Sequence, residues 1–280
     1  MRSMTRRRRI KNAFIHSSIP FKGLLAQGVL RGYERYLSLR GGRDQRTEDN
    51  GLAVPPPRLR VLVAGTADLD WFLSSGRIQA NYLHNLLTGV ACPIHEMDAI
   101  LDFGCGCGRM TRWWSDLSGP QIHGCDYNRD LVDWCDVNLS FVRARANNLQ
   151  PPLPYVDGSF DFLYAYSVFT HLSTELVHQW MADFKRLVKP GGLVWFTVHG
   201  ESFRERLLPE EKGQFDAGKI VVWLPEIEGT NLCGTYWPNA AVESMLGGDF
   251  ETLVHLNPKT DPVTAGSALL THDAYLIRRS

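Results

Sequence analysis

The stretch Asp98-Ala-Ile-Leu-Asp-Phe-Gly104-Cys-Gly106-Cys-Gly108-Arg109 joins an apolar run to a loop with glycine at every second position. This pattern predicts a buried strand that ends in a glycine turn. Glycine adopts backbone angles that a side chain forbids, and it lets a ligand approach the main chain closely. Residues 109–117 have apolar side chains at helical spacing, so we expect the loop to open onto a helix N-terminus, which favours anionic or polar ligand atoms.

An acidic residue also stands at the end of the next strand. The strand candidate 121–125 ends in Asp126, where a carboxylate can accept both hydroxyls of a ribose. A glycine loop alone is shared by dinucleotide oxidoreductases and phosphate-binding proteins. Here the glycines run G-x-G-x-G, and Asp102 lies two places before the first of them.

With these residues in view, the chain resembles the class I S-adenosylmethionine-dependent methyltransferases of small-molecule type, whose first motif looks like Leu101–Arg109. The resemblance covers about residues 75 to 280. It includes the turn 157–161 before the fourth strand and Lys189-Pro-Gly-Gly192 before the fifth. It implies an α/β fold: a Rossmann-like three-layer α/β/α sandwich, with a mostly parallel seven-stranded sheet and an antiparallel C-terminal strand.

The resemblance also implies a cofactor, S-adenosyl-L-methionine, and a set of residues that bind it. These are Asp102, Gly104, Cys105, Gly106, Gly108, Asp126, Tyr127, Asn147, Asn148, Leu149, Tyr166 and Ser167. Many relatives have an aspartate near residue 147 for the adenine amino group, and an asparagine amide can make the same contact. We expect no metal site, because Cys105 and Cys107 lie inside the loop and no second ligand pair has suitable spacing.

The order of strands and helices follows from periodicity and turn residues. Asn128 and Ser173 are expected to cap helices. Besides the strand that ends in the glycine turn and the helix at 109–117, the expected strands are 59–64, 121–125, 141–146, 162–166, 193–198, 250–256 and 268–278, and the expected helices are 75–89, the segments after Asn128 and Ser173, and 239–246. This order favours a methyltransferase domain over 59–280 with its core from about residue 75.

Residues 1–58 are predicted to be a basic N-terminal extension. Residues 1–50 hold 12 Lys/Arg and 4 Asp/Glu, which gives a formal charge of +8 and leaves −8 for the rest of a neutral chain. We interpret the start as a solvated tail, with contact to nucleic acid or an anionic membrane as the less favoured alternative. Residues 14–38 predict one or two amphipathic helices broken at Pro20 and Gly23, and 41–57 a proline-rich linker.

The sequence also predicts the role of the N-terminal extension. Its helices should pack on the catalytic domain or on a second subunit, so a homodimer stays open. Because every recognised motif lies beyond residue 98, we expect residues 1–50 to be dispensable for cofactor affinity. Nucleic acid is not an expected partner.

The segment 200–238 departs from the alternation of strands and helices and is predicted to be an insertion that acts as a substrate lid. Its Trp223, Tyr236 and Trp237 are expected to wall an apolar acceptor pocket. His171 and His199 follow the fourth and fifth strands, so they are candidates for the catalytic base. The alternative is that the aromatic side chains belong to the core and that both histidines are structural.

The amino-acid composition indicates the cellular location that we expect. Six cysteines without disulfide spacing favour a reducing, cytoplasmic location. No apolar run approaches the ~18 residues that span a bilayer, so we expect no transmembrane segment.

Three functions remain open. The first is a methyltransferase that acts on an O, N or C atom of a small-molecule acceptor. The second is a nicotinamide-dependent oxidoreductase, which would need a second βαβαβ half that the sequence does not suggest. The third is a non-catalytic protein that binds S-adenosylmethionine as a scaffold.

Overall fold

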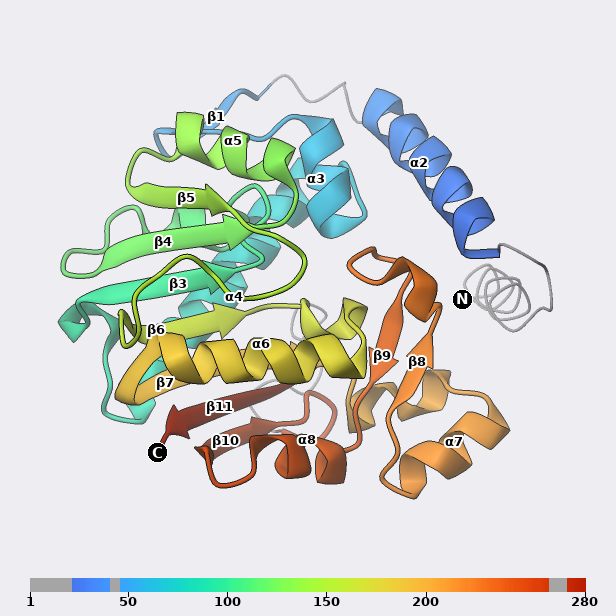
Figure 1. Cartoon of the computed structure of the whole chain (residues 1–280). Coiled ribbons are helices and arrows are strands. Elements are labelled where there is room, and N and C mark those ends of the chain that lie inside the picture. The colour runs from blue at the N-terminus through green and yellow to red at the C-terminus, as the bar shows by residue number, and fades with distance from the viewer. Residues whose placement is uncertain (1–21, 41–45, 262–270) are drawn as a thin grey trace.

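The main body is a mixed seven-stranded sheet (Figure 1). The structure is a computed structural model that describes residues 22–40, 46–261 and 271–280. The strand order is β10-β11-β7-β6-β3-β4-β5. The strands are β3 (Ala99–Phe103), β4 (Gln121–Asp126), β5 (Val142–Ala146), β6 (Phe160–Ala165), β7 (Val188–Val198), β10 (Phe250–Leu256) and β11 (Asp273–Arg279). Five of them are parallel neighbours and β11 is antiparallel to both β7 and β10, which confirms the predicted Rossmann-like fold.

Helices cover both faces of this sheet and make the other two layers. The first face packs against α6 (Thr174–Leu187) and α8 (Asn239–Leu246), and the second against α4 (Leu69–Gly89) and α5 (Arg129–Asn138). The predicted caps are present, since the side chains of Asn128 and Ser173 accept from backbone N–H groups at the starts of α5 and α6. Every helix in the described part of the chain is too short or too polar to span a bilayer.

The central strand β3 shows how the sequence produces the layers. All five of its side chains are buried, as expected for a parallel strand covered on both faces. Leu101 and Phe103 pack toward α6, whereas Ile100 packs toward α4. Asp102 follows the same alternation as Ile100, so its carboxylate enters the α4 side of the sheet.

The expected strand at 59–64 is wrong, because this segment is helix α3 (Pro57–Ala64). Pro57 occupies the first turn, where its missing N–H costs nothing, and Gly65 ends the helix with φ 65°. The buried Arg60 guanidinium donates to Pro55 O at 2.7 Å and Ala67 O at 2.8 Å, which joins the two ends of α3. A short apolar run does not distinguish a buried helix from a strand by periodicity alone.

The helix expected at 109–117 is also wrong. After the glycine loop the chain forms only a short 3-10 helix, Thr111–Trp114. The Thr111 hydroxyl donates to the Asp102 carboxylate, and Trp114 Nε1 donates to Tyr164 Oη at 2.9 Å. Polar contacts to the sheet therefore hold this segment, and the loop opens onto a turn instead of an α-helix N-terminus.

Two further boundaries differ at the ends of the chain. The described part of the extension before residue 41 is the continuous helix α2 (Lys22–Arg40), and residues 14–21 lie outside the described residues. The seventh strand begins at Asp273 instead of residue 268, and 262–270 also lie outside the description.

The described part of the predicted linker is docked on the domain. It forms a hairpin of β1 (Glu48–Asp49) and β2 (Leu52–Ala53). The Arg112 guanidinium donates to three carbonyl oxygens of this hairpin. The division of the chain at residue 58 stays a prediction.

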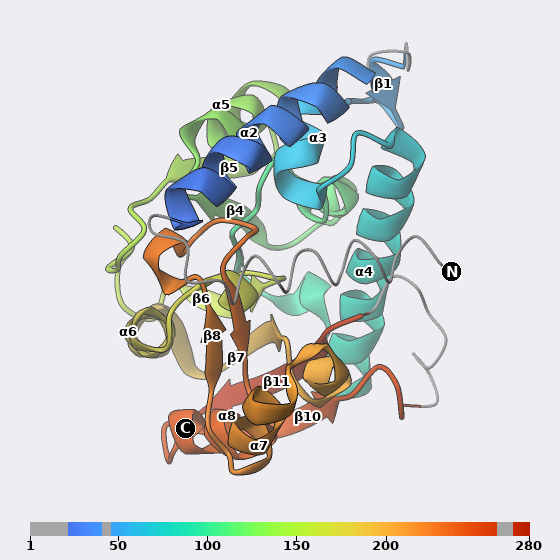
Figure 2. The same cartoon turned by 90° about the vertical axis from the view of Figure 1, so that its right-hand side faces the viewer.

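The insertion between β7 and α8 is a small layer of its own (Figures 1 and 2). Its elements are two 3-10 helices, Glu201–Arg206 and Pro225–Ile227, helix α7 (Pro209–Asp216), and the antiparallel strands β8 (Val221–Trp223) and β9 (Gly234–Tyr236). It buries a separate apolar cluster of Phe203, Leu207, Phe215, Val221, Trp223, Leu224, Ile227 and Tyr236.

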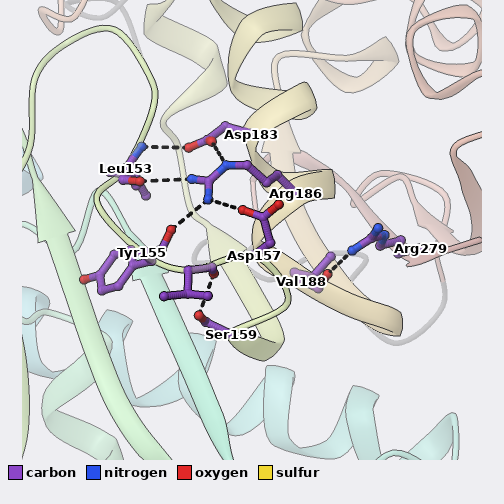
Figure 3. A network of polar contacts seen from close by, with 9 residues as sticks. Leu153, Tyr155, Asp157, Ser159, Asp183, Arg186, Val188 and Arg279 are labelled. Atoms are coloured by element: carbon purple, nitrogen blue, oxygen red, sulfur yellow. Dashed lines mark hydrogen bonds and ion pairs between the residues drawn. The ribbon is translucent and has the colours of Figure 1, made fainter.

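A network centred on Arg186 holds the loop before β6 onto α6 (Figure 3). The guanidinium donates to Leu153 O at 2.9 Å and to Tyr155 O at 2.7 Å. It also pairs with the carboxylates of Asp157 and Asp183, each at 2.8 Å. Asp183 in turn accepts a hydrogen bond from Leu153 N at 2.8 Å. The backbone of the loop therefore both donates hydrogen bonds to side chains of α6 and accepts them.

Replacement of Arg186 by methionine should lower the free energy of unfolding by about 2–3 kcal/mol, because hydrogen bonds to charged groups are lost. Urea unfolding measures the change. The control is Lys185→Met, which removes an exposed ion pair with Asp249 and should cost less than about 1 kcal/mol. Equal effects of the two substitutions would contradict this role of Arg186.

Candidate functional site

A cavity of about 400 Å³ lies at the carboxyl ends of β3, β4, β5 and β6. The structure brings most of the predicted site residues to its wall. These are Asp102, Gly104, Cys105, Gly106, Asp126, Tyr127, Asn147, Leu149, Tyr166, Ser167 and His171. Among the described residues, the lining does not include Gly108, Asn148 or His199, so these three predicted site residues lie outside the cavity wall.

The three glycines of the loop are required by close packing as well as by backbone conformation. Gly104, Gly106 and Gly108 have φ of 78°, 57° and 73°, in the left-handed region. A Cβ on Gly104 would lie 2.5 Å from Val168 Cγ2, and one on Gly106 would lie 2.6 Å from Val63 Cγ2. Gly108 does not line the cavity, and its conformation determines the path of the loop behind the cavity wall. The backbone of Gly104 and Gly106 is therefore bare where it meets the cavity.

Asp126 anchors the loop to the end of β4. Its Oδ2 accepts from Gly106 N at 3.0 Å, and its Oδ1 accepts from Asn128 N at 2.8 Å. Burial raises the pKa of this carboxyl group. Each oxygen has a further lone pair, so the carboxylate can still accept hydroxyl groups from a ligand.

Asp102 is the second buried carboxyl group of the cavity. It accepts from the hydroxyls of Thr111 and Tyr164, the latter at 2.9 Å. Burial raises its pKa to about 6, and the two hydroxyl donors oppose this shift. The group is mostly ionised at neutral pH, so it presents a negative charge to a ligand.

Arg109, which sequence reasoning did not assign to the site, is a buried positive charge beside Asp102. Its Nη1 donates to Gln79 Oε1 at 2.5 Å and to Ser75 Oγ at 3.3 Å, and its guanidinium lies 5.0 Å from the Tyr166 ring centroid. Within the described part of the chain it forms no ion pair with a carboxylate. Burial lowers its pKa. The sequence feature that could have identified Arg109 as a site residue is its position immediately after the last glycine of the motif.

The wall near β5 is built from the asparagine segment. Asn147 N donates to Asp126 O at 3.1 Å, which places this residue beside the carboxylate. Leu149 lines the cavity next to Trp180, whose Nε1 donates to Leu149 O at 3.1 Å. Asn148 lies between these two lining residues in the sequence. Its side chain is exposed and is not part of the cavity wall.

Two segments far from the motifs close the cavity. Residues 229–231 of the insertion line it, and Tyr127 Oη donates to Gly229 O at 2.5 Å across the opening. Helix α2 contributes Gln27, Arg31 and Glu34. Residues of the N-terminal extension therefore lie at the cavity, and the expected dispensability of residues 1–50 for cofactor affinity stays a prediction.

The two predicted histidines have different positions. His171 lines the cavity, and its Nδ1 lies 2.8 Å from Cys233 O. His199 stacks instead with Phe203 and His272, at centroid distances of 4.4 Å and 5.4 Å. His272 was not predicted; burial lowers its pKa to about 3, so it is neutral. Only His171 of the two candidates meets the cavity.

The expectation that aromatic residues of the insertion wall an acceptor pocket is wrong. Trp223 and Tyr236 belong to the core of the insertion. Trp237 is fully buried in the main core against α6 and α8. These side chains stabilise the insertion and its attachment to the domain, and none of them lines the cavity.

All six cysteines are free thiols. A hydrogen bond with Cys135, together with burial, raises the pKa of Cys105 well above its ordinary value, and burial does the same for Cys107 and Cys125, so these thiols are protonated. The described residues contain no group of three His, Cys, Asp or Glu side chains arranged to hold a metal ion.

Comparison with known proteins agrees with this geometry. Residues 101–196 match the methyltransferase domain family. The chain is 27% identical over 103 residues to methyltransferase GfsG of Streptomyces halstedii, covering 33% of this chain and 34% of GfsG. It is 27% identical over 158 residues to a putative methyltransferase of Encephalitozoon cuniculi, covering 56% and 71% of the two chains. The chain thus spans only about a third of the length of GfsG.

A solved structure extends the likeness over most of the fold. The 1,6-didemethyltoxoflavin-N1-methyltransferase of Burkholderia thailandensis superposes with a TM-score of 0.52 at 15% identity, covering 85% of this chain and 97% of that one. The fold is that of the class I, Rossmann-like methyltransferases. Residues 101–196 match the methyltransferase domain, and the proteins of this class use S-adenosylmethionine as their cofactor.

Proposed function

We propose that this protein transfers the methyl group of S-adenosylmethionine to an O, N or C atom of a small-molecule acceptor. The observation that carries the proposal is the set of charges on one cavity wall. Asp102 and Arg109 offer opposite buried charges to an amino-acid end, and Asp126 offers a carboxylate to a ribose. The cofactor contains both of these groups.

The proposed roles follow from the donors and acceptors of each side chain. Ionised Asp102 accepts from the ammonium group of the methionine part, and Arg109 donates to its carboxylate. Asp126 accepts from the ribose hydroxyls with its remaining lone pairs. Asn147 and Leu149 flank the adenine, where an amide can bond the base and an apolar side chain can contact its face.

Bound S-adenosylmethionine supplies an electrophilic methyl group. The chain then has three tasks, which are to orient the acceptor atom, to exclude water and to remove a proton where the acceptor carries one. His171 is the proposed base because it lines the cavity, whereas His199 does not. The insertion 200–238 is the proposed lid, through the wall formed by residues 229–231.

A small acceptor is favoured by the size and the borders of the cavity. Its volume is about 400 Å³, and residues of α2 and of the insertion line it. The structurally similar protein from Burkholderia thailandensis has 1,6-didemethyltoxoflavin bound, and this supports the same class of acceptor here. The six free thiols support a reducing, cytoplasmic compartment.

S-adenosylmethionine should bind to the purified protein in a calorimetric titration, whereas NAD⁺ should not. Asp126→Asn should weaken this binding by about 10- to 100-fold, because charge-assisted hydrogen bonds are worth about 1.5–3 kcal/mol. The matched control is Asp136→Asn, an exposed carboxylate on α5 outside the cavity, which should bind like the wild type.

Three results would count against the proposal. Binding of NAD⁺ in place of S-adenosylmethionine would favour an oxidoreductase. Undiminished affinity in a folded Asp126→Asn variant would remove this carboxylate from the site. Binding without any S-adenosylhomocysteine formed, across a panel of small acceptors analysed by product mass, would favour a scaffold.

Once an acceptor is found, His171→Gln should lower turnover by about 100-fold or more, because a positioned base contributes at least this much. The variant should also lose the dependence of turnover on pH near neutrality. His199→Gln serves as the control and should keep both the rate and the pH profile within a few-fold. Similar losses in the two variants would show that histidine packing, and not proton transfer, controls the rate.

A further inference from the structure

Helix α2 exposes apolar residues on the side that is turned away from the cavity. Gln27, Arg31 and Glu34 line the cavity on its inner side. The opposite side carries an apolar stripe at spacings of three and four residues, which is one helical face. The stripe consists of Leu25, Val29, Tyr33, Tyr36 and Leu39, with exposed fractions of 53%, 73%, 48%, 48% and 77%. We call these five residues the outer stripe.

The position of α2 leaves the outer stripe open to solvent. The helix packs against α3 and against the 3-10 helix Pro225–Ile227 of the insertion. In Figure 2 it lies diagonally across the molecule in front of α3 and β5, as the outermost element on that side. A contiguous exposed apolar surface of this kind is characteristic of an interaction site.

Charge identifies what the outer stripe contacts. Residues 22–40 contain four basic residues and one acidic residue, a formal charge of +3. The preceding residues 1–21 add six basic residues and no acidic one. The chain from 1 to 40 therefore carries +9, whereas residues 41–280 carry −9.

We propose that the outer stripe of α2 docks on an anionic lipid surface. An amphipathic helix with basic residues lies in a membrane interface with its apolar face among the acyl chains, and anionic head groups attract its charges. The two exposed tyrosines suit this depth, since their rings are apolar and their hydroxyls polar. The inner side of α2 would meanwhile stay on the cavity wall.

A second copy of the chain fits the same face less well. Two α2 helices brought together would juxtapose two helices of formal charge +3, so that like charges repel across the contact. An anionic surface instead neutralises each of them. The lipid surface therefore accounts for both the apolar and the basic character of this region.

Vesicle co-sedimentation of the full-length protein tests the proposal. The probes are vesicles of phosphatidylcholine alone and vesicles with about a quarter of phosphatidylglycerol. We expect binding to the anionic vesicles, at least about tenfold weaker binding to the neutral ones, and weakening when salt rises from about 0.1 M to 0.5 M.

The decisive variant is Leu25→Gln/Val29→Gln/Leu39→Gln, which keeps every charge. It should lose at least about tenfold in affinity for anionic vesicles, because three apolar side chains no longer enter the interface. The control Val137→Gln/Val156→Gln changes two valines outside α2 that are 80% and 79% exposed, and should bind like the wild type. Circular dichroism checks that both variants are folded.

Several outcomes overturn the proposal. Wild-type affinity in the triple variant would assign binding to the basic residues alone. Equal binding to neutral vesicles would remove the role of charge. Absence of vesicle binding would exclude the lipid surface, and it would favour a second copy if light scattering shows a dimer that the triple variant loses, or nucleic acid if the protein binds a short DNA duplex.

Discussion

The lack of space behind the glycine loop is the constraint on which the site depends. Gly104 and Gly106 press against Val168 and Val63, so neither position has room for a side chain. The loop can then bend back until Gly106 N–H reaches the Asp126 carboxylate. One hydrogen bond between the ends of two strands thus joins the bare backbone of the cavity to the Asp126 carboxylate, and both lie at the edge where parallel sheets bind ligands.

Residues close to the strand ends could be predicted from the sequence, because motif spacing determines where a parallel strand stops. Asp102, Asp126 and Tyr166 are of this kind. Arg109 was missed because the direction of its side chain depends on a 3-10 turn. The apolar periodicity of this segment predicts an α-helix instead. The α2 residues on the wall could not be predicted at all, since their approach depends on tertiary packing across more than sixty residues of sequence. The prediction for Trp237 was wrong because a bulky side chain near the ligand-binding edge of the sheet can also pack in the core.

Charge is distributed in this molecule with two different consequences. Inside the cavity, Asp102 and Arg109 are buried side chains of opposite charge, so each favours a ligand group of the other sign. Outside, α2 combines a positive formal charge with an apolar stripe whose side chains are largely exposed. The same helix borders both regions. The proposed ligand site and the proposed lipid-binding surface are therefore neighbours in the structure and consist of separate residues.

The most direct measurement is a crystal structure of the protein with S-adenosylhomocysteine. The account predicts the ribose hydroxyls on Asp126, the amino group at Asp102 and the carboxylate at Arg109, all within hydrogen-bond distance. A ligand bound in the cavity in the reverse direction, with adenine between Asp102 and Arg109, or bound elsewhere on the chain, would contradict it.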